Sequence, residues 1–169
     1  MKAGPRYHVK SRRHRQGRTD YRKRLALLKS RKTRIVVRKS LKNITVQFVD
    51  YHAPGDKIVL SVLSKELINK YQWKYSVSTT PAAYLTGLIA GKQALDKGIT
   101  EGIFDIGRYR PTVGNKLFAT LKGLVDAGIS IPHNEEMFPQ DDRLLGKHLD
   151  AGIAPATEGI KTKILGGKK

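Results

Sequence analysis

Three aspartates lie where a metal-dependent nuclease could place its carboxylates. Asp50 and Asp56 flank one short turn, and Asp105 is the acid within an apolar, strand-like segment. Clustered carboxylates that hold divalent metal ions are a common catalytic centre for reactions on polyanions. Acids beside a turn are also common for conformational reasons, and a buried acid requires an ionic or hydrogen-bonding partner. Both interpretations are open, and the residues favour the conformational one.

Other patterns that carry chemistry are missing from the sequence. There is no cysteine, which excludes thiol catalysis, cysteine zinc sites and disulfides. The five histidines lack metal-ligand spacing, and the sequence contains neither a phosphate-binding glycine loop nor a nucleophile elbow. The sequence therefore predicts no metal and no cofactor.

The strongest chemical signal is positive charge. The chain has 33 Lys and Arg against 14 Asp and Glu, a net charge of +19. Residues 1–42 hold 17 of the basic residues and one acid, Asp20. A concentration of charge at this level predicts a nucleic-acid partner, because the chain would otherwise repel itself.

Residues 1–19 form a basic arm that has no apolar periodicity. The segment contains Gly4, Pro5 and Gly17 and nothing that could build a core, so we expect it to be extended and disordered in isolation. Its arginines can bind phosphate oxygens in bidentate fashion, and Tyr7 and His8 could stack on unpaired bases.

A helix is predicted next, from a cap at Thr19 or Asp20 to about Ser30. Tyr21, Leu25 and Leu28 form one apolar stripe, which we expect to pack on the domain while basic residues face outward.

Three strand-like segments follow, at Thr33–Lys39, Asn43–Tyr51 and Asp56–Leu63. Their short connections predict an antiparallel meander. Arg34 and Arg38 fall on the same face of the first strand.

A helix from Thr80, its predicted cap, to Gly98 should carry a stripe of small residues, Ala83, Gly87, Ala90 and Ala94, which we expect to pack on the sheet. The strand Gly102–Gly107 after this helix is predicted to be parallel to its neighbour. Helices at 114–127 and 140–149 follow, and residues 158–169 are expected to be loose.

The predicted fold is therefore α/β, with three layers and a mixed sheet of a three-strand antiparallel meander plus one parallel strand. We divide the chain into the arm (1–19), an α/β RNA-binding domain (20–139) that includes the basic helix 20–30, and a C-terminal helix and basic tail (140–169). The loop 107–112 carries Arg108 and Arg110 at the start of a helix and is a second candidate RNA contact.

Three blocks of sequence resemble a known family: RRHRQGRTDYRKRLALLKSRKTRIVVRKS, TTPAAYLTGLIAGKQAL and FDIGRYRPTVGNKLFATLKGLVDAGISIPH. The chain is similar to the archaeal and eukaryotic branch of the universal large-subunit ribosomal protein that binds 5S rRNA, numbered eighteen in the bacterial subunit. The resemblance covers Gly4 to about His133 and fades beyond Pro139. It implies a ribonuclease-H-like fold without the nuclease carboxylates and without enzyme activity.

The resemblance also implies a role in the cytoplasmic ribosome. The arm would penetrate rRNA, and the domain would attach 5S rRNA to the large-subunit rRNA at the central protuberance, beside a neighbouring 5S-binding ribosomal protein. No membrane and no small-molecule substrate is expected. By motif match, the resemblance assigns RNA contacts to Arg6, Tyr7, Lys10, Arg12, Arg13, Arg15, Arg18, Tyr21, Arg22, Arg24, Arg34, Arg38, Lys39, Asn43, Arg108 and Arg110.

Two rival functions share some of these features. A chromatin-type binder of duplex DNA would have the same charge, although the chain lacks a recognisable major-groove helix motif. A binder of membrane surfaces would need an amphipathic helix with bulky apolar residues, which the sequence does not offer.

Overall fold

Alternating apolar residues build a four-stranded sheet at the centre of the protein. In the computed structural model, which describes residues 4–166, its strands are β1 (Arg34–Lys39), β2 (Ile44–Asp50), β3 (Lys57–Leu63) and β4 (Ile103–Asp105). Their order is β3-β2-β1-β4. Strand β2 is antiparallel to both β1 and β3, and β4 is parallel to β1. The predicted mixed sheet is confirmed.

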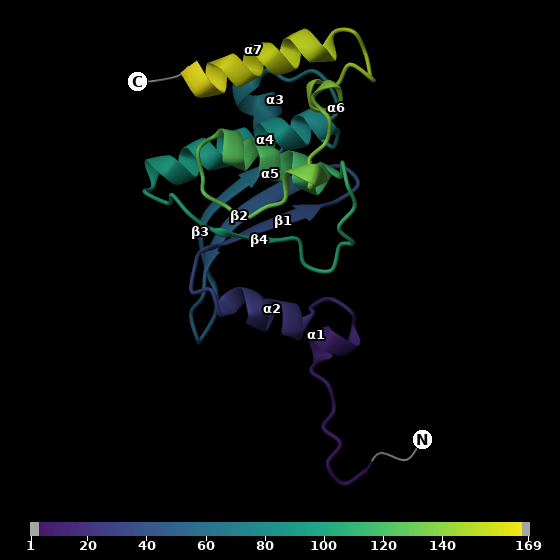
Figure 1. The fold of residues 1–169 in the computed structure, drawn as a ribbon, viewed down its shortest axis with the longest axis vertical. Helices are drawn as coiled ribbons and strands as arrows, with labels where there is room; N and C mark the ends of the chain where they lie inside the picture. The colour runs from purple at the N-terminus through teal and green to yellow at the C-terminus, as the bar shows by residue number, and fades with distance from the viewer. Residues whose placement is uncertain (1–3, 167–169) are drawn as a thin grey trace.

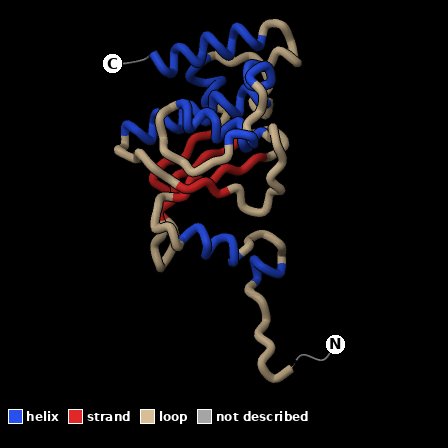
Figure 2. Tube along the Cα trace, in the orientation of Figure 1, coloured by secondary structure: helices blue, strands red, loops and turns tan. Residues whose placement is uncertain are grey.

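The helices cover this sheet in layers. In chain order they are α1 (Arg12–Arg15), α2 (Tyr21–Leu28), α3 (Glu66–Tyr71), α4 (Thr80–Asp96), α5 (Lys116–Asp126), α6 (Asp141–Leu145) and α7 (Ile153–Gly166), with a 3-10 turn, η1 (Glu135–Met137). Figures 1 and 2 show α4 and α5 along one face of the sheet, α7 beyond α4, and α1 and α2 on the opposite side. The flanking helices confirm the predicted α/β class.

The core lies between the sheet and the pair α4 and α5. Ile35 and Val37 of β1 and Val46 and Phe48 of β2 are fully buried, while the residues between them are less so. This alternation follows from the two-residue period of a strand, which sends successive side chains to opposite faces. Arg34 and Arg38 share one face of β1, as the sequence predicts, and the structure shows that this face is turned away from the core.

Gly87, in the small-residue stripe of α4, packs against α5, whereas the sequence predicts that this stripe packs on the sheet. A Cβ added to Gly87 would lie 2.2 Å from the carbonyl oxygen of Thr120, and one on Gly123 would lie 2.2 Å from that of Tyr84. Both contacts join α4 to α5, so Gly87 serves helix–helix packing and not packing on the sheet. Glycines at a crossing let two backbones approach closely, and sequence spacing does not say which neighbour approaches.

The C-terminal prediction is wrong in two places. Helix α6 ends at Leu145 because Gly146 is left-handed (φ +85°), so it does not reach residue 149. Residues 158–166 belong to α7, which buries Ile153, Ile160 and Ile164, whereas we expected a loose tail. These isoleucines recur at helical spacing and cover α4, and this pattern outweighs the glycine and lysine content. Residues 167–169 of the expected tail lie outside the described residues.

The arm and α2 also differ from expectation. Part of the arm is helical, α1, and Arg13 Nε donates to Thr19 Oγ1 (3.0 Å) just after it. Most of the apolar stripe of α2 does not pack on the domain: Tyr21 is 39% exposed and Leu25 57%, and Leu28 is only half-buried. The reason is that α2 faces the charged side of the sheet, where Arg24 forms an ion pair and an apolar stripe would find few partners.

Candidate nucleic-acid interface

Helix α2 begins at a capping aspartate. The Asp20 carboxylate accepts hydrogen bonds from the backbone N–H groups of Arg22 (3.0 Å) and Lys23 (3.2 Å), as the sequence predicts. The hydrogen bond from Lys23 is the main cause that lowers the pKa of Asp20. The single acid of the basic region thus stabilises the first turn of a cationic helix.

Ion pairs, and not apolar burial, join α2 to the sheet. Within α2, which is described in full, none of the eight residues is buried. Arg24 Nη2 binds both oxygens of Asp56, at 3.1 and 2.9 Å. Asp56 Oδ2 also accepts from Arg34 Nη2 (2.5 Å), so this one carboxylate connects the helix, the β2–β3 turn and β1.

The same arginine reaches a second carboxylate. Arg34 Nη1 lies 3.1 Å from Asp105 Oδ2, and both side chains are more than nine-tenths buried. Arg38 Nη2 binds the other oxygen of Asp105 (3.2 Å), and its Nη1 donates to the Asp105 backbone carbonyl (2.7 Å). The two arginines share one face of β1, and Asp105 lies on the neighbouring parallel strand.

These pairs account for the three aspartates that could have held metal ions. Asp56 and Asp105 are neutralised by arginines, and Asp50 accepts a hydrogen bond from Thr33 Oγ1 (2.7 Å). Among residues 4–166, no group of three or more histidines and acids is placed to hold a metal. The geometry favours the conformational interpretation of these carboxylates.

The loop after β4 meets the arm. The Arg108 guanidinium lies against Gly17, where its Nη1 would be 3.4 Å from an added Cβ. Tyr109 anchors the loop, because its hydroxyl donates to the Lys39 carbonyl (2.5 Å) and its ring lies beneath the Lys39 ammonium. The arm and the loop after β4, which meet at Gly17 and Arg108, therefore form one cationic surface although these two residues are 91 positions apart in sequence.

Most of the residues predicted to contact RNA are accessible. Those with exposed side chains are Arg6, Tyr7, Lys10, Arg12, Arg13, Arg15, Arg18, Tyr21, Arg22, Arg108 and Arg110; Arg24, Arg38, Lys39 and Asn43 are half-buried, and Arg34 is buried. Arg34 binds two carboxylates, so it supports the surface from beneath and offers little area to a ligand.

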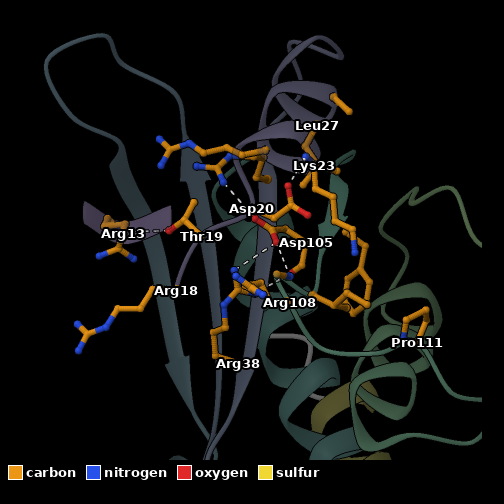
Figure 3. A pocket seen from close by; sticks show the side chains of 16 residues that line it. Arg13, Arg18, Thr19, Asp20, Lys23, Leu27, Arg38, Asp105, Arg108 and Pro111 are labelled. Carbon is orange, nitrogen blue, oxygen red and sulfur yellow. Dashed lines mark hydrogen bonds and ion pairs between the residues drawn. The ribbon is translucent and has the colours of Figure 1, made fainter. Parts of the chain in front are cut away.

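One further basic residue was missed by motif matching. Lys23 is exposed on α2 and lines the same hollow as Arg13, Arg18, Arg38 and Arg108. Figure 3 shows these side chains around one space between the N-terminal helices and the sheet. The positive charge of Lys23 can be read from the sequence, but the direction in which its side chain points depends on how α2 is rotated.

The fold and this surface define a class: a basic, nucleic-acid-binding α/β protein with a cationic N-terminal extension. No helix within residues 4–166 combines the length and apolar character that crossing a membrane requires.

Comparison with known proteins identifies the family. The model for "Ribosomal large subunit proteins 60S L5, and 50S L18" matches residues 5–103 and 96–134. The chain is similar to large ribosomal subunit protein uL18 of Korarchaeum cryptofilum (51% identity over 149 residues, 88% of this chain and 76% of the relative). It is also similar to uL18 of Methanothrix thermoacetophila (46% over 170 residues, 98% and 100%) and of Aeropyrum pernix (46% over 161 residues, 95% and 73%). The chain belongs to this family of large-subunit ribosomal proteins, which places it in the ribosome, in the cytoplasm.

Proposed function

We propose that this ribosomal protein binds 5S rRNA, attaches it to the large-subunit rRNA at the central protuberance, and catalyses no reaction. The observation that carries the proposal is the concentration of exposed arginines on the arm, α2 and the loop after β4, on the side of the sheet away from the core. A neighbouring 5S-binding ribosomal protein is the expected protein partner.

The chemistry of the surface suits folded RNA. Arginines on the arm can each bind phosphate oxygens through two parallel hydrogen bonds and displace condensed counterions. Tyr7 is 61% exposed, so its ring is available to stack on an unpaired base. Phosphate contacts supply affinity, and the fixed geometry of α2 and the loop supplies selectivity for shape.

The test is a titration of the purified protein against 5S rRNA, transfer RNA and duplex DNA at physiological salt. We expect 5S rRNA to be preferred by about a hundredfold, which corresponds to roughly 2.7 kcal/mol. For ~6–10 phosphate contacts, affinity should fall ~10³–10⁵-fold between about 50 and 200 mM salt. Equal affinity for the three nucleic acids would contradict a dedicated 5S rRNA partner, and preference for the duplex would favour the DNA-binding rival.

A matched pair of variants separates specific contacts from total charge. Replacing Arg12, Arg13 and Arg15 by Ala removes three charges from the arm, and replacing the exposed Lys65, Lys74 and Lys163 removes three from elsewhere. We expect the arm variant to reduce the salt slope by about 2–3 units, since each phosphate contact contributes about 0.7–0.9. Equal losses in the two variants would mean that binding follows net charge alone.

A further inference from the structure

A hollow large enough for a small ligand lies between α2 and the sheet. Its volume is about 460 Å³. Protein interiors are otherwise close-packed, as the contact of Gly87 with α5 illustrates here. The hollow is lined by Ala26 and Leu27 of α2 on one side and by residues of β1, β4 and the loop after β4 on the other, and ion pairs to Asp56 join the helix to the sheet beside it.

The lining of this hollow combines two kinds of surface. Seven of the described residues that line it are basic and two are acidic, so it attracts an anion. The remaining wall includes Leu27, Phe104, Ile106 and Pro111, which offer apolar contact that a phosphate group alone cannot use. A ligand that matches both surfaces has a flat apolar part joined to an anionic part.

A buried arginine adds a fixed charge at the wall of the hollow. Arg34 lines the hollow and is 5% exposed, and its Nε, which surrounding atoms cover, has no hydrogen-bond partner among residues 4–166. Because Nε is covered, Arg34 contributes positive charge to the hollow and not a free donor. Its Nη atoms are held by Asp56 and Asp105, so the guanidinium is fixed in place.

We propose that this hollow receives a single unpaired nucleotide of the bound RNA, with its base against the apolar wall and its phosphate at the basic rim. The inference rests on the proposed RNA-binding function and deepens it. Pockets of this size that combine an apolar wall with a few polar groups are typical of small-ligand sites, and unpaired bases are what proteins read in folded RNA. The hollow would then fix the register of α2 on the RNA, in addition to the charge contacts of the arm.

The first experiment uses free nucleotides on the full-length, isotopically labelled protein. Adenosine, guanosine, cytidine and uridine monophosphates are titrated while the amide resonances of Leu27, Ile106 and Gly107 are followed by NMR. We expect at least one nucleotide to shift them saturably, and ribose 5-phosphate, which has the phosphate but no base, to shift them much less at equal concentration. Equal effects of ribose 5-phosphate and the nucleotides would mean an anion site without base recognition and would overturn the proposal.

The second experiment fills the hollow. Ala26→Trp places a large side chain at its wall, and Leu25→Trp serves as the control, because Leu25 is 57% exposed and lines a separate hollow beside the β2–β3 turn and not this one. We expect A26W to abolish the nucleotide shifts and to weaken 5S rRNA binding by about 5- to 150-fold, the range that one stacked base is worth. Ala26→Leu, which adds less volume and retains high helix propensity, should give a smaller loss in the same direction.

The outcomes separate this proposal from the proposed function. Loss of nucleotide binding in A26W without loss of rRNA affinity would mean that the hollow accepts free nucleotides but no nucleotide of the RNA, and would overturn the inference. An absence of nucleotide shifts together with unchanged rRNA binding by A26W would overturn it as well. In both cases, a preference of the wild-type protein for 5S rRNA would still support the proposed function. If the wild type shows no such preference, the proposed function itself is contradicted.

Discussion

Removing Asp105 is the most direct test of how the cationic face is held together. Its carboxylate binds Arg34 at 3.1 Å and Arg38 at 3.2 Å, and the residue is 6% exposed. Replacement by Ala leaves Arg38 able to turn to water, because that side chain is 41% exposed. Arg34 is buried and keeps a single carboxylate partner, Asp56.

The expected cost follows from this arrangement. Breaking a buried ion pair by removing one partner costs about 3–5 kcal/mol. Because Asp56 still compensates the Arg34 charge, we expect Asp105→Ala to lower the free energy of unfolding by about 3 kcal/mol, the lower end of that range. With a typical urea dependence of about 1–3 kcal/mol/M, the midpoint of urea unfolding should fall by about 1–3 M.

The control is a shorter ion pair at the surface. Lys32 and Glu101 are 2.5 Å apart, with side chains 42% and 56% exposed. Glu101→Ala should cost less than about 1 kcal/mol. The difference between the two variants should persist at about 1 M salt, where exposed pairs are screened and buried ones much less so. Equal midpoints for the two variants would refute the conclusion that the buried pair stabilises this face.

The same position also tests the nuclease alternative. Asp105→Asn removes the charge with little change in shape. We expect neither the wild type nor this variant to cleave 5S rRNA in the presence of Mg²⁺, as followed on denaturing gels. Cleavage by the wild type that Asp105→Asn abolishes would make this aspartate a catalytic residue.

Three further predictions concern the arm and the packing of the helices. Deleting residues 1–17 should leave the thermal unfolding of the domain nearly unchanged and weaken binding to 5S rRNA strongly; a cooperative transition at a much lower temperature would contradict an independent arm. Gly87→Ala should destabilise the protein by about 1–3 kcal/mol in urea unfolding, since the added carbon overlaps a backbone carbonyl of α5. The control Gly159→Ala has open space around it in α7 and should be neutral or stabilising by up to about 1 kcal/mol. Ile160→Ala should lower the free energy of unfolding by about 2–5 kcal/mol, because Ile160 is part of the core. The control Leu165→Ala should lower it by less than about 1 kcal/mol, since Leu165 is 46% exposed. Similar midpoints of urea unfolding for the two variants would show that α7 contributes little to stability.

The sheet could be predicted from the sequence because its signals are local. Alternation in β2 and β3, β-branched residues in β1 and short turns predict the antiparallel meander, and the helical crossover predicts that β4 is parallel to its neighbour. The structure adds that this neighbour is β1. The end of α4 before Gly98 was likewise predicted, and Asp20 is one of the two caps that the sequence offered for α2, since capping chemistry acts within one turn. The start of α4 differs by one residue, with Thr79 as the cap instead of Thr80.

Features that depend on a distant partner could not be predicted. The orientation of α2 is set by Asp56, thirty-two positions away from Arg24, and an apolar stripe in isolation suggests the opposite rotation. The burial of Arg34 depends on two carboxylates from different parts of the chain, so a motif that marks it as an RNA contact cannot reveal that it is covered. The hollow beside α2 has no signal in the sequence because its lining residues come from the arm, α2, β1, β4 and the loop after β4, which only the folded chain brings together.

The position of α7 in the core has a consequence for synthesis of the chain. Ile164 is buried against the rest of the fold, so the native core is incomplete until nearly all of the polypeptide has left the ribosomal exit tunnel. At about 5–20 residues per second, the end of the arm at residue 19 is made roughly 7–29 s before Ile164 is added. During that interval a strongly cationic segment is displayed beside abundant cellular RNA without its folded domain. In that period, contacts of the arm with RNA depend on its charge alone, without the shape selectivity that α2 and the loop after β4 add in the folded protein.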